Sequence, residues 1–205
     1  MSGYLVPLRE AQAEYVEKRS RFIGHILPVD SEEAARAHIE AVKKQHRDAR
    51  HNCWCYRLQG GVERYSDDGE PQGTAGVPML AVFQKAGVTN LCCVVTRYFG
   101  GVLLGAGGLV RAYTQAAKDA LEAAGIGQMA PWLRLGLDCP YPLLEQVKLL
   151  CAQCDGVVED IQYTDAARLT ARFPVAQAEN FSGLVKELTA GALVPDILEE
   201  IMAPA

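Results

Sequence analysis

Hydrophobic and polar positions at the start of the chain predict a strand followed by a helix. Residues 13–29 are rich in β-branched and aromatic side chains with partial alternation, which is typical of a strand. Ser31 is expected to cap a helix that continues with helical spacing to His46. Glu32 and Glu33 suit the positive N-terminal end of that helix.

The middle of the chain alternates between strand patterns and loop composition. Residues 51–59 alternate and end at a Gly-Gly turn, whereas residues 88–99 are mostly apolar, as in a strand buried on both faces. Between them, residues 65–76 have loop composition, and a helix capped by Thr74 is expected to follow. A glycine-rich loop then leads into a strong helix pattern that ends at Gly125.

The pattern after residue 131 predicts the order β-α-β-β-α-β, which fits a ferredoxin-like sandwich. Strands are expected over 132–138, 157–163, 167–174 and 193–201, and helices over 142–154 and 175–190. The segment 125–131 contains Gly and Pro and is expected to be a linker. We therefore expect an α+β protein with one domain over residues 1–127 and a second over residues 128–205.

Composition limits the class of protein. The chain has 205 residues, of which 49% are hydrophobic and 22% charged, as in an ordinary globular protein. No apolar run reaches the roughly 18 residues of a membrane-spanning helix, and the start lacks the basic-then-apolar pattern of a signal peptide. Seven cysteines without a secretion signal indicate reduced thiols. We therefore expect a cytoplasmic protein with no membrane contact.

Charge is distributed unevenly along the chain. Residues 1–129 carry 15 Lys+Arg and 14 Asp+Glu, whereas residues 130–205 carry 5 and 11. All four histidines also lie in the first part. A polyanionic partner is therefore expected to meet the first part of the chain.

Glycines crowd the stretch Thr96–Tyr113, where a strand is expected to pass into a helix. Backbone amides at a helix N-terminus carry partial positive charge, and glycines let a phosphate or carboxylate approach them. Arg97 and Arg111 flank this loop, and we expect the Thr74 loop to lie near the same anion. The spacing matches neither the dinucleotide fingerprint nor the Walker loop, and tight packing is the alternative explanation. The glycines concerned are Gly100, Gly101, Gly105, Gly107 and Gly108.

The loop around residue 68 carries three carboxylates, Asp67, Asp68 and Glu70. Such a group can bind a divalent ion or act as acid and base, and a charged turn explains it equally well. The spacing is not that of an EF-hand loop. The acidic loop is therefore a candidate functional segment without an assigned ligand.

Cysteines occur near other chemically active groups at two places. On an alternating strand, His51, Cys53 and Cys55 share one face, where a nucleophile or metal pair competes with simple core packing. Cys151 and Cys154 have the spacing of a zinc or redox pair, but no second pair accompanies them. We favour packing in both cases, and we predict no metal site, no cofactor and no catalytic residue.

Two basic segments in the first part suggest a surface that follows phosphates, with a solvated helix end as the alternative. The first holds Lys18, Arg19 and Arg21, and the second holds Lys43, Lys44, His46, Arg47, Arg50 and His51. Aromatic side chains interleave with them and are candidates for stacking on bases. These are Trp54, Tyr56, Tyr98 and Phe99.

Four strings in the first part resemble the signatures of the IMPACT / YigZ family. They are "KRSRFIG", "HRDARHNC", "YSDDGEPQGTAGVPML" and "VVTRYFGGVLLGAGGLVRAY". They occur in order across about residues 15–113, and they are long and unusual. The rest of the chain resembles the small C-terminal domain of bacterial members, with a weaker signature.

The resemblance implies an N-terminal two-layer α/β domain similar to domain IV of elongation factor G. It also implies a ferredoxin-like C-terminal domain similar to domain V of that factor. Eukaryotic relatives regulate translation through protein contacts. Function argued from a fold is an analogy.

Three functions follow from these observations. The first is a translation-associated regulator that binds RNA or the ribosome through the N-terminal domain. The second is a regulator that contacts a translation-linked protein without nucleic acid. The third is an enzyme that acts on a phosphorylated ligand at the glycine-rich loop. We favour the first because the N-terminal part is the more basic one.

Overall fold

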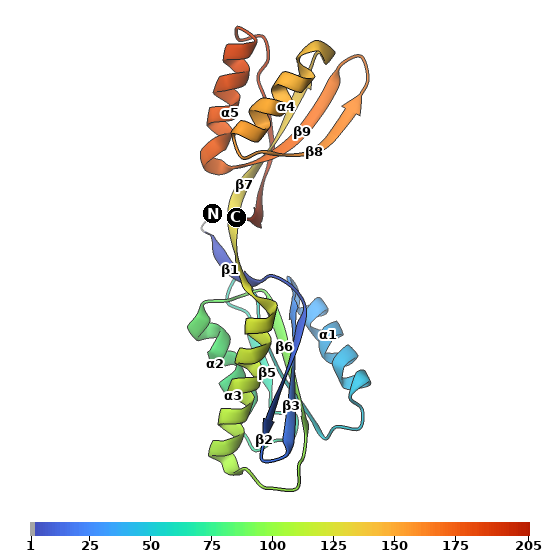
Figure 1. The fold of residues 1–205 in the computed structure, drawn as a ribbon, viewed down its shortest axis with the longest axis vertical. Helices are drawn as coiled ribbons and strands as arrows, with labels where there is room; N and C mark the ends of the chain where they lie inside the picture. The colour runs from blue at the N-terminus through green and yellow to red at the C-terminus, as the bar shows by residue number, and fades with distance from the viewer. Residues whose placement is uncertain (1–2) are drawn as a thin grey trace. The chain divides into compact units, whose positions relative to one another are not determined.

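The computed structural model of the protein describes residues 3–205, which form two compact units (Figure 1). The first unit spans Tyr4–Gln128 and the second includes Met129–Ala205. No helix in the described part of the chain is long and apolar enough to cross a membrane.

The first unit is built on an antiparallel sheet with the strand order β2-β3-β6-β4-β5. Its strands are β2 (Ala11–Glu17), β3 (Ser20–Pro28), β4 (His51–Arg57), β5 (Glu63–Ser66) and β6 (Leu91–Tyr98). A short strand that the pattern did not indicate, β1 (Tyr4–Pro7), precedes them. The central strand β6 is buried on both faces, as its apolar sequence predicts.

Helices cover both faces of this sheet (Figure 1). On one face, α1 (Glu32–Gln45) packs over Cys92 and Val94 of β6. On the other face, α2 (Gly76–Ala86) and α3 (Gly105–Ala124) pack over Cys93 and Val95. The expected two-layer arrangement is therefore wrong, because successive apolar residues of β6 supply a core on each side of the sheet.

The segment 13–29 is two strands rather than one. Strands β2 and β3 form a hairpin, and Lys18 and Arg19 between them adopt positive φ angles of 46° and 67°. This pair of left-handed residues is the geometry of a tight hairpin turn, which glycine or asparagine usually supplies. The turn was missed because neither residue type signals it in the sequence.

The second unit confirms the expected order β-α-β-β-α-β. It consists of β7 (Ile126–Cys139), α4 (Leu144–Gln153), β8 (Val157–Tyr163), β9 (Ala167–Pro174), α5 (Val175–Leu188) and β10 (Asp196–Pro204), with a 3₁₀ turn at Tyr141–Leu143. Strands β10, β7, β9 and β8 pair antiparallel in this order, and β1 is a further neighbour of β7 in the same sheet. Residues 126–131 of the expected linker 125–131 instead begin β7, and residues 129–131 pair with β10.

Three arginines lie on the sheet of the second unit, and each is paired with carboxylates. Arg168 bridges Asp138 and Asp196 at 2.7 Å each. Arg134 pairs with Glu159 and Glu199, and Arg172 also reaches Glu159. The positive charges of this sheet are therefore balanced within the unit itself.

Candidate functional site

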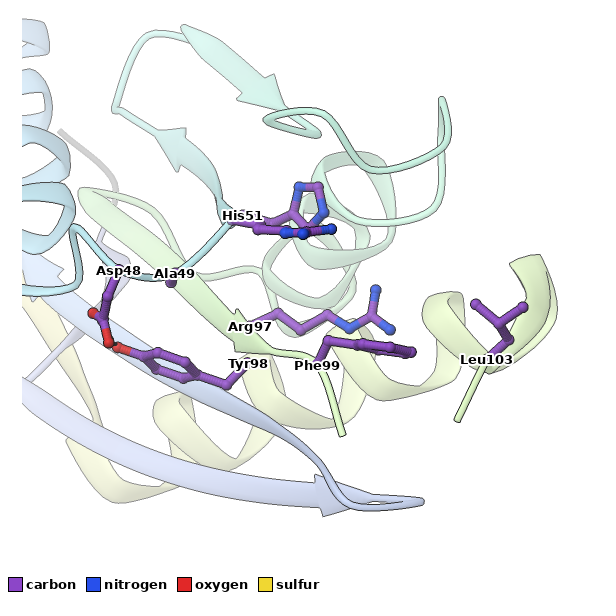
Figure 2. Close-up of a pocket in the computed structure, with 8 residues that line it drawn as sticks. Asp48, Ala49, His51, Arg97, Tyr98, Phe99 and Leu103 are labelled. Atoms are coloured by element: carbon purple, nitrogen blue, oxygen red, sulfur yellow. Dashed lines mark hydrogen bonds between the residues drawn. The ribbon is translucent and has the colours of Figure 1, made fainter. Parts of the chain in front are cut away.

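A hollow of about 330 Å³ lies where β4 begins and β6 ends in the first unit (Figure 2). Its lining combines basic, aromatic and apolar side chains from two segments that are distant in sequence, 48–51 and 97–103. The lining residues are Asp48, Ala49, Arg50, His51, Arg97, Tyr98, Phe99 and Leu103. We call it the arginine hollow. The structure thus brings four of the expected binding residues together, namely Arg50, His51, Arg97 and Tyr98.

Arg97 is a buried cation at this hollow, with 8% of its surface exposed. Its Nη1 donates to Glu70 Oε1 at 2.7 Å. Its guanidinium group lies 5.5 Å from the ring centre of Phe22 and 5.6 Å from that of Phe99. The Nε atom is buried and has no hydrogen-bond partner among the described residues. A fixed positive charge with unused donor capacity therefore borders the hollow.

Behind Arg97, a buried polar network continues into the core. The hydroxyl of Tyr113 donates to Glu70 Oε1 at 2.8 Å, and Cys53 Sγ donates to the Tyr113 oxygen at 3.3 Å. Burial raises the pKa of Cys53 and that of Tyr113 well above their usual ranges. The Cys53 thiol therefore stays protonated, which favours packing over a nucleophilic role beside His51.

His51 has a fixed orientation at the edge of the arginine hollow. Its Nδ1 lies 2.9 Å from the backbone carbonyl oxygen of Asp68. A carbonyl oxygen only accepts, so Nδ1 carries the hydrogen and Nε2 is the nitrogen left for other contacts. Neutral His51 can accept a hydrogen bond at Nε2, and the protonated ring can donate one to an anion.

The acidic loop is used for internal hydrogen bonds. Asp67 accepts from the backbone N–H groups of Gly73, Ala75 and Gly76 at 2.8–3.0 Å, so it caps α2. The expectation that Thr74 caps this helix is wrong. Its hydroxyl instead donates to the Pro71 carbonyl at 2.6 Å.

The other two carboxylates of this loop are also engaged. Asp68 accepts from the Asn52 N–H at 2.8 Å and from Lys43 Nζ at 3.2 Å. Glu70 is held by Arg97 and Tyr113. No group of three potential metal ligands converges within residues 3–205. Hydrogen bonds within the fold thus account for all three carboxylates.

We call residues 99–108 the glycine loop. Close backbone approach and left-handed backbone angles explain why most of its glycines are required. A Cβ on Gly100 would lie 2.0 Å from the backbone carbon of Arg19, and one on Gly108 would lie 2.9 Å from the Leu104 Cβ. Positive φ angles occur at two further glycines. These are Gly101 and Gly105, with φ of 85° and 71°. Gly107 is different, because the only atom near its Cβ position is Arg111 Nη1 at 3.7 Å.

Three further cationic residues lie away from the arginine hollow. Arg111 lines a separate hollow beside Tyr15 and Lys118. Lys18 and Arg19 occupy the β2–β3 turn. Arg21 is nearer, because its guanidinium group lies 5.8 Å from the Tyr98 ring centre, although its Nε also donates to Glu14 at 2.8 Å. The expected site is therefore divided among several surfaces of the first unit.

The sequence indicated Lys43, Trp54 and Tyr56 as candidate binding residues, but not that they line a second hollow of about 350 Å³ between α1 and the strands β4 and β5. It combines aromatic side chains of the sheet with cations from the helix and from β5. It is lined by Arg36, Ile39, Glu40, Lys43, Trp54, Tyr56, Arg64 and Tyr65. We call it the tryptophan hollow. The seven-residue spacing of Arg36 and Lys43, which places them on one helix face, was the available signal.

A cluster of buried histidines between β3 and α1 was also not foreseen. The ring centres of His25 and His46 are 5.0 Å apart, and His46 Nδ1 lies 2.9 Å from the Tyr98 hydroxyl. The Nε2 atoms of His25, His38 and His46 are buried without a hydrogen-bond partner in the described chain. Burial lowers the pKa of His25 to about 4 and also lowers that of His38. The fold therefore favours the neutral forms of His25 and His38.

The seven cysteines are free and buried. Cys151 and Cys154 belong to the hydrophobic core of the second unit, which supports the packing interpretation of their spacing. Burial raises the pKa of Cys151 to about 12 and also raises that of Cys154. Their thiols are therefore protonated at neutral pH.

Both parts of the chain match known protein-family models. Residues 18–121 match the family model of the Impact N-terminal domain, and residues 137–192 match a domain of unknown function, DUF1949. A solved structure described as "an hypothetical protein" is 36% identical, with a TM-score of 0.63. The alignment covers 97% of this chain and 98% of that one.

Two bacterial relatives are similar to this protein over nearly its whole length. IMPACT family member YigZ of Escherichia coli is 37% identical over 98% of this chain and 100% of its own length. IMPACT family member YvyE of Bacillus subtilis is 34% identical over 93% of this chain and 89% of its own. Protein IMPACT of Mus musculus is 32% identical over 43% of this chain and 30% of its own.

Proposed function

The chain belongs to the IMPACT family, and from that premise we propose that it is a translation-associated regulator whose first unit binds RNA, alone or on the ribosome. The proposal includes a likeness of the two units to domains IV and V of elongation factor G. The observation that carries it is the arginine hollow, where Arg50, His51 and Arg97 meet the exposed aromatic ring of Phe99.

This arrangement has the chemistry that single-stranded RNA requires. Cationic side chains attract phosphates, and an exposed aromatic ring offers a surface on which a base stacks. Phe99 is 54% exposed, and Arg97 lies against its ring. The second unit lacks a comparable excess of positive charge, because its three sheet arginines are paired with carboxylates.

The test is binding of a labelled single-stranded 12-mer RNA, followed by fluorescence anisotropy at 50 and 200 mM salt. Arg50→Ala should weaken binding several-fold at low salt and flatten the log–log salt dependence by about one unit. Phe99→Ala should weaken binding with an unchanged salt slope. Lys186→Ala, an exposed change in the second unit, is the matched control.

Purified ribosomes provide the second arm of this test. Co-sedimentation that is lost in Arg50→Ala and kept in Lys186→Ala would support the ribosome as the RNA source. The proposal fails if neither the RNA nor the ribosome binds in a salt-dependent way.

A second candidate function is contact with a protein through the glycine loop. Val102 is 41% exposed and Leu103 is 84% exposed, so two apolar side chains project from this loop. Neighbouring exposed apolar residues are typical of a protein contact. Proteins that the parent captures from a nuclease-treated lysate, and that Leu103→Ser does not, would favour this function over RNA binding.

A further inference from the structure

We propose that the tryptophan hollow binds one unpaired nucleobase, which stacks on Trp54 while the neighbouring phosphates meet Arg36, Lys43 and Arg64. This inference rests on the proposed RNA-binding function and extends it to a second site. The partner is then a single strand rather than a duplex, because the bases of a duplex are already paired and stacked.

The aromatic floor of this hollow is fixed by the sheet. Trp54 and Tyr56 are two residues apart on β4, so their side chains share one face. Their rings are stacked with centres 5.7 Å apart and an angle of 6° between their planes. Tyr56 is buried, and its hydroxyl donates to Glu32. Trp54 therefore rests on an immobilised ring and remains partly exposed to the hollow.

Cations reach the hollow from two directions. Arg36 and Lys43 lie two turns apart on α1, and Arg64 of β5 lies directly opposite Tyr56 of β4. Of the residues that line the hollow, only Glu40 is a carboxylate. Lys43 also bonds Asp68 at 3.2 Å, and Arg36 lies 3.6 Å from Glu32. The lining itself carries three cations and one carboxylate around an aromatic ring, while Glu32 and Asp68 outside the lining offset part of the charge of Arg36 and Lys43. Cations beside an aromatic ring are the combination that binds single-stranded nucleic acid.

Asp68 links the two hollows. Its carboxylate accepts from Lys43 at the tryptophan hollow, and its backbone carbonyl accepts from His51 at the arginine hollow. Along β4, His51 and Trp54 are three residues apart, so their side chains point to opposite faces of the sheet. The two hollows are therefore separate sites that share Asp68, and each is tested with its own variants.

Fluorescence of Trp54 gives a direct readout. The chain has two tryptophans, and Trp132 is a buried residue of the second unit. A single-stranded adenylate 8-mer should quench the fluorescence of the parent and of Trp132→Phe, but not that of Trp54→Phe. The corresponding duplex should quench much less.

Affinity variants separate stacking from charge. Trp54→Phe keeps an aromatic face and should bind within about threefold of the parent, whereas Trp54→Leu keeps the apolar bulk and should bind roughly 5–100-fold more weakly. Arg64→Gln should flatten the salt dependence by about one unit of log–log slope. Thermal melting of each variant identifies any loss of folding, and Trp54→Phe remains informative if Trp54→Leu does not fold.

The possible failures point to different conclusions. RNA binding that depends on Arg50 but leaves Trp54 fluorescence and Trp54→Leu affinity unchanged overturns the base site and leaves the proposed function standing. Equal quenching by the duplex overturns the single-strand preference. If no RNA binds, the proposed function fails. Adenosine monophosphate then decides the base site, because quenching of Trp54 supports it and unchanged fluorescence overturns it.

Discussion

Arg97 Nη1 donates to Glu70 Oε1 at 2.7 Å in a site where both side chains are more than nine-tenths buried. This contact joins the end of the central strand β6 to the acidic loop. Glu70 also accepts from Tyr113 of α3, so one carboxylate connects a strand, a loop and a helix. Hydrogen bonds in the core therefore connect the acidic loop to the strand before the glycine loop and to the helix after it.

Glu70→Ala should lower the free energy of unfolding by about 3–5 kcal/mol, because it leaves the Arg97 charge buried without its partner. The measurement is urea denaturation followed by circular dichroism. Glu14→Ala breaks the exposed pair with Arg21 and should cost no more than about 1 kcal/mol. Equal losses in the two variants would show that the buried pair does not organise the fold.

Asp67→Ala should destabilise the protein by about 1–2 kcal/mol, because the start of α2 then loses its capping carboxylate. Thr74→Ser keeps the hydroxyl that donates to Pro71 and serves as the control. Melting temperatures of both variants check the prediction. Equal melting temperatures of Asp67→Ala and Thr74→Ser would show that the Asp67 carboxylate does not stabilise the start of α2.

Gly100 and Gly107, both in the glycine-rich stretch 96–113, should respond in opposite ways to substitution by alanine. Gly100→Ala should destabilise the protein strongly, because the new Cβ overlaps the backbone of Arg19. Gly107→Ala has open space in α3 and should stabilise the protein by up to about 1 kcal/mol through helix propensity. Chemical denaturation of the two variants tests this contrast, which fails if Gly107→Ala is the less stable of the pair.

Stability should fall as the pH drops below about 6.5. The pKa of His25 is about 4 in the fold and near 6.5 when unfolded, so the unfolded chain binds more protons between these values. The stability from neutral His25 is thus fully present above pH 6.5 and is lost toward pH 4, at no more than about 1.4 kcal/mol per pH unit. Urea midpoints at pH 7.5, 6 and 5 measure this slope.

His25→Gln should flatten the slope between pH 6.5 and 5, because the ring that binds more protons in the unfolded chain is then absent. An identical slope in the parent and in His25→Gln would remove His25 as its source.

Much of the fold followed from local patterns in the sequence. The apolar run of β6, the Ser31 cap and the strand–helix order of the second unit all appear in the structure, because burial and capping act within a few residues. The β2–β3 turn was missed because Lys18 and Arg19 adopt a conformation that their residue types rarely signal. The sequence pattern did not show that helices cover both faces of the first sheet, because this depends on contacts between residues that are distant in sequence.

The candidate site was less predictable for a related reason. Arg50, His51 and Arg97 converge because β4 and β6 are neighbouring strands, with His51 directly opposite Arg97. The order of strands in a sheet cannot be predicted from the local pattern of hydrophobic and polar residues. Arg111 shares the glycine stretch with Arg97 but lies in another hollow. The sequence did not indicate Arg64 as a binding residue, yet the pairing of β5 with β4 places it opposite Tyr56.

The burial of all seven thiols makes the native surface unreactive toward maleimides and other thiol-directed labels. A cysteine placed at the highly exposed position of Leu103 would then be the single accessible thiol of the chain. A spin label or photo-activated probe attached there would report from the glycine loop alone. The unmodified cysteine background would therefore be sufficient for site-specific labelling, with no native thiol to replace.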